Sequence, residues 1–232
     1  MRVKLSMRLQ AILELMEPCE VFTDIGSDHG LLAMAAIMQG KAGRVVATDI
    51  REAPLAAAHK AIAAQGLEQQ IRLLLSDGFA SLDPQDLQQI VIAGMGGSLI
   101  RQIIQRARQR GLDFDTHCRR LVLQPMNHQG GLRHWLASVG WEIIAERILA
   151  EKRHYYQIIV TRPGGAPYSL TWLEEHLGPY NLEHRDIGVE SCVAHEIRLR
   201  QGILLAMQQG EAYNPCREEQ LRRELLELQQ VI

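Results

Sequence analysis

The stretch FTDIGSDHG, residues 22 to 30, combines a glycine-containing turn with two carboxylates. Glycines after a strand let the backbone approach a bound ligand closely, and many such turns hold phosphate. In this turn Gly26 lies between Asp24 and Asp28, with His29 beside them. Two carboxylates repel a pyrophosphate at short range and attract a cation. The turn therefore predicts a ligand that has a positively charged end.

S-adenosylmethionine fits this requirement, because it carries a sulfonium and an ammonium and has no phosphate. The dinucleotide fingerprint G-x-G-x-x-G does not fit, since Asp28 and Leu31 stand where its second and third glycines would be. An alternative is that Asp28 caps a helix that begins near Gly30, because Asp is favoured at that position. That alternative leaves Asp24 unexplained.

Three further motifs fall where parallel strands would end. Asp49 ends a β-branched run 23 residues after Gly26, where its carboxylate could accept hydrogen bonds from both ribose hydroxyls of an adenosine. In SDGF (76–79), Asp77 could accept from an adenine amino group while Gly78 lets the chain pass near the ring. In IAGMGG (92–97), three glycines would let a ligand lie against the backbone. The alternatives are a turn aspartate at 49 and an ordinary Asp-Gly turn at 77–78.

The elements that would position these residues alternate regularly. Apolar, β-branched runs predict strands at 20–25, 44–49, 71–75, 89–94 and 120–124. Segments with helical periodicity lie between them and before the first strand, at 5–16, 31–39, 52–65, 97–110 and 130–139. This alternation predicts a parallel sheet with helices on both faces. The runs 141–149 and 155–162 then predict an antiparallel hairpin at the sheet edge.

The composition changes at TRPGGAP (161–167), which is typical of a linker. We expect a ligand-binding domain over 1–162 and a coiled-coil-like helical domain over 163–232. The second domain would contain two helices joined through 208–216 into an antiparallel hairpin. The apolar residues that would line its seam are Val193, Ile197, Leu204, Met207, Leu221, Leu225, Leu228 and Ile232.

The overall composition is ordinary for a globular protein, with 47% hydrophobic and 22% charged residues among 232. A net charge of −2 gives no global signature of nucleic-acid binding, so any basic surface must be local. The four cysteines lie far apart without a C-x-x-C pair, and no apolar run could span a bilayer. We expect a reduced, cytoplasmic protein without a metal, in which His128, His134 and His154 lie at the surface.

Several motifs together carry a resemblance to a known family. LSMRL, DIGSDHG, TDIREAPLAAA, SDGF, IAGMGG, LQP and YYQIIV resemble, in order, the motifs of the bacterial tRNA (adenine-22-N1)-methyltransferase family, TrmK, from about Leu5 to Thr161. The resemblance implies an α/β fold of the class I methyltransferase type, Rossmann-like, with a mostly parallel seven-stranded sheet and a C-terminal α-helical hairpin. It also implies S-adenosyl-L-methionine as donor and N1 of adenine 22 in the tRNA D arm as acceptor.

The same resemblance implies roles for individual residues. The methionine end of the cofactor would be bound by Asp24, Gly26, Asp28 and His29. The ribose would be bound by Asp49, and the adenine by Asp77 and Gly78. Ala93, Gly94 and Met95 would form the floor of the pocket near the methyl group. The chain departs from the family at Leu31 to Ala33, where the family has Tyr-Leu-Pro. It also departs at Met126, which extends the family's LQPN to LQPMN.

Methylation of adenine N1 needs no catalytic base, because N1 of neutral adenine has an in-plane lone pair. Alignment of N1 with the methyl group should supply much of the rate, and the base must leave its pair first because N1 lies on the Watson–Crick edge. Residues expected to contact tRNA are Arg8, Arg101, Arg106, Arg108, Arg110, Arg119, Arg120, Gln124 and Asn127, with Lys4, Arg198 and Arg200 as additional cations. For each arginine, the alternative is a solvated helix face.

The leading hypothesis is therefore a tRNA adenine-N1 methyltransferase that works as a monomer or weak homodimer. A second hypothesis is a methyltransferase of a small molecule or protein, which would need an enclosed pocket and no basic surface. A third is a non-catalytic RNA-binding protein that retains the fold without binding the cofactor.

Overall fold

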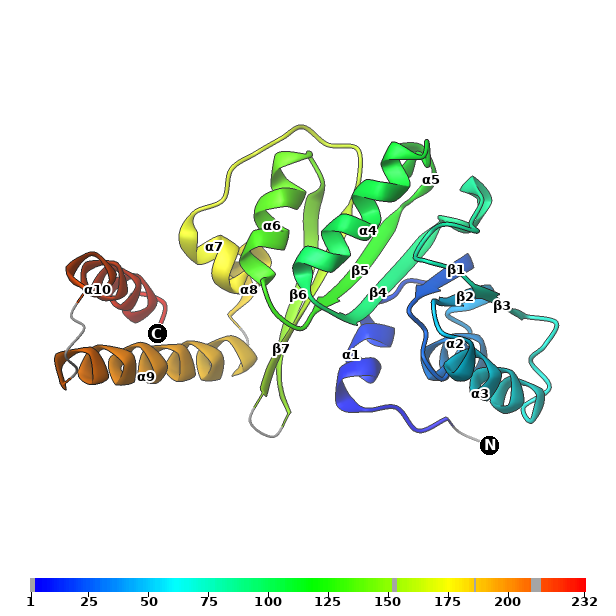
Figure 1. Cartoon of the computed structure of the whole chain (residues 1–232), viewed down its shortest axis with the longest axis horizontal. Coiled ribbons are helices and arrows are strands. Elements are labelled where there is room, and N and C mark those ends of the chain that lie inside the picture. The colour runs from blue at the N-terminus through cyan, green and yellow to red at the C-terminus, as the bar shows by residue number, and fades with distance from the viewer. Residues whose placement is uncertain (1–2, 152–153, 186, 210–213) are drawn as a thin grey trace.

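A seven-stranded sheet in the order β3-β2-β1-β4-β5-β7-β6 forms the centre of the protein (Figure 1). The computed structural model describes residues 3–151, 154–185, 187–209 and 214–232. The parallel strands are β1 (Cys19–Ile25), β2 (Ala42–Asp49), β3 (Ile71–Leu75), β4 (Gln89–Met95) and β5 (Arg120–Pro125). At one edge, β7 (His154–Arg162) runs antiparallel to β5 and to β6 (Glu142–Glu151). The predicted strands and the antiparallel pairing of the two edge strands are confirmed, although residues 152–153 between them lie outside the described residues.

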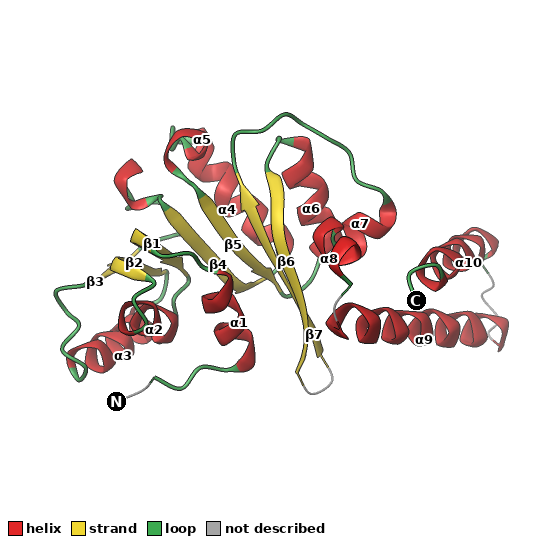
Figure 2. Cartoon of the chain, turned by 180° about the vertical axis from the view of Figure 1, so that it is seen from behind, coloured by secondary structure: helices red, strands yellow, loops and turns green. Residues whose placement is uncertain are grey.

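Helices cover both faces of the sheet (Figure 2). One apolar cluster packs α1 (Met7–Leu15), α2 (Leu31–Met38) and α3 (Glu52–Ala63) on one face. A second packs α4 (Gly97–Gln109), α5 (Phe114–His117) and α6 (Gln129–Ser138) on the other, and η1 (Pro84–Asp86) precedes β4. The alternation of side chains along β4 explains the two layers, because Ile90 and Ile92 belong to the second cluster and Val91 to the first.

The central strands β1 and β4 run parallel, but the order in which strands are added to the sheet reverses between them. From β1 the chain moves outward through β2 and β3, and it then returns to β4 on the other side of β1. The carboxyl ends of β1 and β4 therefore diverge into a crevice, which is where open α/β sheets bind ligands.

The C-terminal part is helical, as predicted, and contains α7 (Trp172–Leu177), α8 (Pro179–His184), α9 (Ile187–Gln209) and α10 (Pro215–Gln229). Figure 1 shows α9 and α10 projecting from the β6 end of the sheet as a hairpin. Its apolar seam buries the predicted residues Val193 and Leu228, whereas Ile232 is exposed and Val231 takes the buried position instead. Within the predicted connection 208–216, residues 210–213 lie outside the described part of the chain.

The sequence did not predict α7 and α8, which fasten the C-terminal part to the sheet domain. Arg133 of α6 is fully buried, and its Nε donates to Glu146 Oε1 of β6 at 2.7 Å. Its Nη1 donates to the Glu175 carbonyl of α7 at 2.9 Å. Glu146 Oε2 also accepts from the amide of Tyr180 in α8, at 3.1 Å. Burial raises the pKa of Glu146, and the charge and hydrogen bond of Arg133 oppose that rise.

No helix in the described ranges is both long and apolar enough to cross a membrane.

Candidate cofactor site

One cavity of about 550 Å³ opens at the carboxyl ends of β1, β2, β3 and β4. The residues predicted to bind the cofactor all line it: Asp24, Gly26, Asp28, His29, Asp49, Asp77, Gly78, Ala93, Gly94 and Met95. They come from four separate segments of the chain, so the carboxyl ends of these strands meet at one edge of the sheet, as predicted. Arg8, expected at the tRNA surface, lines the same cavity.

The turn after β1 is shaped by glycine and held to β2. The amides of Gly26 and Ser27 both donate to the carbonyl of Thr48, each at 2.8 Å. Gly26 has a φ of +76°, and a Cβ there would overlap the terminal methyl of Met95. The next helix, α2, has Gly30 as its N-cap and no side-chain cap. Asp28 therefore does not cap this helix, and the helix-cap alternative is wrong.

Asp24 is a buried carboxylate without a complete set of partners. It is 4% exposed, and its Oδ2 has no hydrogen-bond partner. Burial raises the pKa of Asp24 to about 7, and the nearby Asp49 carboxylate adds to the rise. Within the described chain, two other buried side-chain atoms lack partners, Ser27 Oγ and Thr48 Oγ1, and both belong to residues at these strand ends. Unpaired buried polar atoms are costly. Asp24 and Ser27 both line the cavity, so their unpaired oxygens indicate a site for a polar ligand, and the Asp24 carboxylate favours a cationic one.

Asp49 lies in the cavity with both carboxylate oxygens engaged. Its Oδ1 accepts from the Arg51 amide at 2.9 Å and from Arg51 Nε at 3.3 Å. Its Oδ2 accepts from the Asp28 amide at 3.2 Å. The exposed Arg51 side chain also reaches Asp28 Oδ1, at 3.3 Å, so it bridges two carboxylates at the cavity mouth. A ribose diol on Asp49 would have to displace the Arg51 side chain.

The end of the cavity near β3 is suited to a flat ring. Ile50, 65% exposed, lines it together with Leu99 and Ile103 of α4. Asp77 lies at this end and is paired with Arg106, with Nη1 to Oδ2 at 3.1 Å. Gly78 has a φ of +59°, and a Cβ there would lie 2.7 Å from Ile103 Cγ2. Ile50 was not predicted from the sequence, although its place directly after Asp49 was the available signal.

The floor of the cavity near Gly94 is held in place by hydrogen bonds to Gln124. Gln124 Oε1 accepts from the Gly94 amide at 3.2 Å and from Arg8 Nη1, and its Nε2 donates to the Pro125 carbonyl at 2.9 Å. Gln124 is fully buried, so the prediction that it contacts RNA is wrong. Asn127 is exposed beside this floor, and its carbonyl accepts from the Gly97 amide at 3.0 Å.

The arginines of α4 do not form one free basic surface. Arg106 pairs with Asp77, and Arg110 donates to the Ala80 carbonyl at 2.8 Å. Arg108 lies 3.7 Å from Asp115 and stacks over Trp141. Arg101 is exposed and has no hydrogen-bond or ion-pair partner in the described part of the chain. Of the cations expected on this helix, Arg101 is the one left free for a phosphate.

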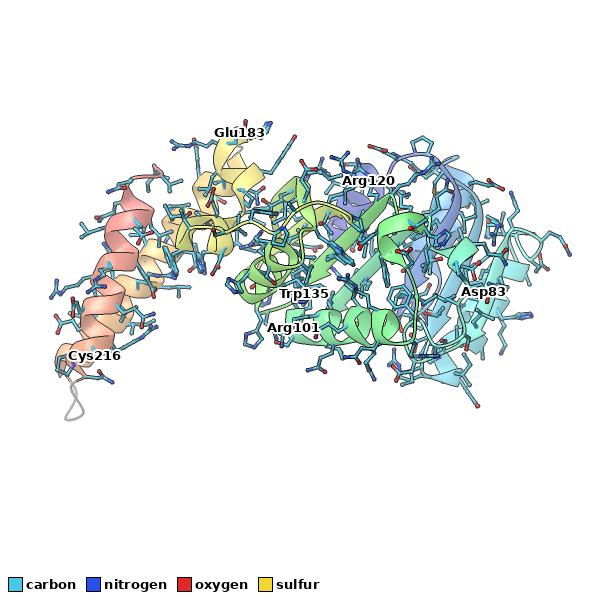
Figure 3. All side chains as sticks on the ribbon, turned by 90° about the horizontal axis from the view of Figure 1, so that it is seen from above. Asp83, Arg101, Arg120, Trp135, Glu183 and Cys216 are labelled. Carbon is cyan, nitrogen blue, oxygen red and sulfur yellow. The ribbon has the colours of Figure 1, made fainter. Side chains whose placement is uncertain are left out.

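Arg119 and Arg120 are far from the cavity, so they do not lie with the other expected tRNA contacts beside it. They lie at the amino end of β5, where Arg120 donates to the Leu15 carbonyl at 3.0 Å and pairs with Glu17. A strand of this length separates them from the cavity edge by roughly 20 Å. Figure 3 shows Arg101 and Arg120 on opposite sides of the sheet domain. Closeness in sequence misled the prediction, because residues 111–119 carry the chain back across the sheet.

The expected second basic patch is also changed by the structure. Arg200 is buried in the α9–α10 hairpin, where it pairs with Glu196 and donates from Nε to Glu224 Oε2 at 2.7 Å. Hydrogen bonds from His176 and Arg200 hold the pKa of Glu196 at about 2, against the opposing effect of burial. Lys4 and Arg198 are exposed.

Metal ligation has no support in the described residues, where no three His, Cys, Asp or Glu side chains lie close enough together to hold an ion. The three histidines assigned to the surface, His128, His134 and His154, are exposed.

Comparison with known proteins agrees with this geometry. Residues 5–159 match the family described as "Methyltransferase domain". The tRNA (adenine(22)-N(1))-methyltransferase of Bacillus subtilis (strain 168) is 35% identical over 162 residues, which cover 70% of this chain and 66% of that protein.

Solved structures are similar over nearly the whole chain. The crystal structure of the B. subtilis m1A22 tRNA methyltransferase TrmK is 27% identical, with a TM-score of 0.83 and full coverage of both chains. Streptococcus pneumoniae Sp1610, a putative tRNA (m1A22) methyltransferase crystallised with S-adenosyl-L-methionine, is 26% identical with a TM-score of 0.83. That likeness covers 98% of this chain and 99% of the streptococcal one.

Proposed function

Because this chain belongs to the bacterial tRNA (adenine-22-N1)-methyltransferase family, TrmK, we propose that it methylates N1 of an adenine in tRNA, adenine 22 of the D arm, with S-adenosylmethionine as donor. The observation that carries the proposal is the acidic cavity at the sheet's carboxyl edge, which is lined by the buried Asp24, whose Oδ2 has no hydrogen-bond partner. The same proposal places the protein in the cytoplasm, where tRNA is found, as a monomer or weak homodimer.

The lining residues fit the parts of the donor in order. Asp24 would face the ammonium, Asp49 the ribose hydroxyls, and Asp77 the adenine amino group. Ile50 and Ile103 would contact the faces of the adenine ring. When bound, the donor supplies an electrophilic methyl group. A hydrogen bond to a charged group contributes about 1.5–3 kcal/mol, so each of these aspartate contacts would strengthen binding by roughly that amount.

The residues near the methyl end act by position and not by proton transfer. Ala93, Gly94 and Met95 form the floor, and the Gly94 amide is fixed by the buried Gln124. Neutral adenine N1 already has a lone pair, so a base is unnecessary and none is assigned. Holding N1 in line with the methyl group supplies the acceleration. The acidic lining also favours the cationic product over the neutral base.

Access of the adenine requires that it leave its pair or stack, because N1 is on the Watson–Crick edge. Arg101 of α4 and Asn127 of the loop before α6 are exposed near the Gly94 to Gly97 turn and would contact the flanking nucleotides. Phosphate contacts of this kind position the RNA without reading its sequence.

The test is methyl transfer to unmodified tRNA from an isotopically labelled donor, followed by digestion to nucleosides and mass spectrometry. We expect the label in 1-methyladenosine. Label in N6-methyladenosine, or no transfer to tRNA by a protein that binds the donor, would contradict the proposal.

A further inference from the structure

The cavity is lined by more negatively charged than positively charged side chains. Four aspartates line it, at 24, 28, 49 and 77, and two arginines, Arg8 and Arg51. Arg51 is paired with Asp49 and Asp28. Arg8 has no carboxylate partner among the residues that the structure describes. The cavity therefore contains one unpaired guanidinium and one buried carboxylate with an unpartnered oxygen, Asp24.

Arg8 is held in place although it lacks an ion pair. It belongs to α1, and its Nη1 donates to Oε1 of the buried Gln124, 116 residues away in sequence. Its guanidinium carbon lies 5.7 Å from the centre of the Tyr156 ring, within the range of a cation–π contact. Its Nη1 also lies 3.3 Å from the point that a Cβ on Gly94 would occupy. A guanidinium has five N–H donors, so these contacts leave donors free to face the cavity.

An amino acid is recognised by one cation and one anion at the same end of a site, since its ammonium and carboxylate share one carbon atom. Asp24 supplies the anion and Arg8 the cation, and both line this cavity. We infer that Arg8 binds the carboxylate of the methionine part of S-adenosylmethionine while Asp24 binds its ammonium. The inference rests on the proposed function and makes the N-terminal helix α1 part of the cofactor site.

A role for Arg8 at the acceptor adenine is less consistent with the chemistry. Methylation at N1 turns the neutral base into a cation, and an unpaired guanidinium nearby would oppose that charge. If the guanidinium is paired with the cofactor carboxylate, the two charges cancel and the pair does not repel the cationic product. The expectation from sequence that Arg8 contacts tRNA is therefore replaced by a role in positioning the cofactor, with Gln124 and Tyr156 orienting its side chain.

The experiment compares two ligands by titration calorimetry. S-adenosylhomocysteine has the amino-acid end, and 5′-methylthioadenosine lacks it. For Arg8→Ala we expect the affinity for S-adenosylhomocysteine to fall by roughly ten- to a hundredfold, as for loss of a charge-assisted bond. The affinity for methylthioadenosine should stay within about twofold, because the ribose and adenine contacts are intact. Retained methylthioadenosine binding also shows that the variant is folded.

Arg8→Met provides a second variant, which keeps an apolar stem against Tyr156 and should give the same selective loss. Arg162→Ala is the matched control, because Arg162 is an exposed arginine paired with Glu142 at the other end of the sheet, and it should change neither affinity. Equal losses for both ligands, or unchanged binding of S-adenosylhomocysteine, would overturn the inference. Failure of the wild-type protein to bind S-adenosylhomocysteine would instead contradict the proposed function.

Discussion

The Asp24 carboxyl is held where its ionisation costs stability. Its pKa is about 7 in the folded protein, mainly through burial, against a usual value of 3.8. Between these two values the folded state binds the proton more tightly than the unfolded chain, so the free energy of unfolding falls as pH rises through this window. A group that is unfavourable to the fold at neutral pH is typical of a binding site, where a ligand charge compensates it.

The titration of Asp24 predicts a pH-dependent affinity for S-adenosylhomocysteine. Only the ionised carboxylate attracts the ligand ammonium, which itself stays mostly protonated below pH 7. With the pKa of Asp24 at about 7, the affinity should rise by about fivefold between pH 6 and pH 7. In Asp24→Asn, binding should be weak and should lose this slope. Calorimetry at the two pH values checks this, and a flat wild-type profile would show that Asp24 does not meet the ammonium.

Asp49 and Arg51 predict opposite results for two neighbouring substitutions. Asp49→Ala should weaken cofactor binding by roughly ten- to a hundredfold, because a charge-assisted hydrogen bond to ribose is lost. Arg51→Ala should bind at least as tightly as wild type, because the Arg51 side chain occupies the Asp49 oxygen that the ribose needs.

The two substitutions are compared by equilibrium binding of S-adenosylhomocysteine at low salt, with circular dichroism as the check on folding. A loss of affinity in Arg51→Ala as large as that in Asp49→Ala would mean that Arg51 supports the ligand and does not compete with it.

At the scale of elements, sequence periodicity was sufficient to predict the strands of the sheet. It was insufficient to predict the long-range contacts and short helices that connect the sheet to the rest of the chain. β-Branched runs located the strands, and their ends placed ten cavity residues together. The contact of Arg8 with Gln124 spans 116 residues and leaves no local pattern. The helices α7 and α8 have only six residues each, too few for a periodic signal.

The buried pair of Arg133 and Glu146 predicts that α6, β6 and α7 depend on one another for stability. Both side chains are fully buried, so Arg133→Ala leaves a carboxylate without compensation and should lower the free energy of unfolding by about 3–5 kcal/mol. Arg223→Ala removes an exposed pair with Glu219 and should cost less than about 1 kcal/mol. Urea denaturation measures both, and similar costs for the two variants would contradict the account.

The predicted domain boundary at residue 162 stays a prediction. The contacts of Arg133 and Glu146 cross that boundary. A deletion ending there would remove the α7 carbonyls that Arg133 contacts and the α8 amide that Glu146 contacts. A C-terminal deletion meant to isolate the cofactor domain should therefore keep residues through Arg185.

At the scale of the whole molecule, many arginines of the described residues are engaged in ion pairs. In the α9–α10 hairpin, Arg200, Arg217, Arg222 and Arg223 are all paired with glutamates. The hairpin thus offers fewer phosphate contacts than its arginine content suggested. The exposed and unpaired Arg101 on α4 lies on the same helix as Leu99 and Ile103, which line the cavity.

Arg101 predicts a specific change in the salt dependence of tRNA binding. If it contacts one phosphate, Arg101→Ala should reduce the slope of log K against log salt by about 0.9. Arg108→Ala is the control on the same helix, because Arg108 is already engaged by Asp115 and Trp141, and its slope should match wild type. Filter binding over a range of salt concentrations gives both slopes. Equal slopes for wild type and Arg101→Ala would remove Arg101 from the RNA surface.

The most direct test of the account maps the methyl group on tRNA after reaction with the wild-type protein. A methyl on N1 blocks Watson–Crick pairing, so reverse transcription stops at the modified base. We predict a donor-dependent stop at adenine 22, strongly reduced with Asp49→Ala when the donor concentration is limiting and absent from a tRNA that carries guanine at that position. A stop at another nucleotide, or transfer that persists at the wild-type rate in Asp49→Ala, would contradict the assignment of this cavity as the site of adenine-N1 methylation.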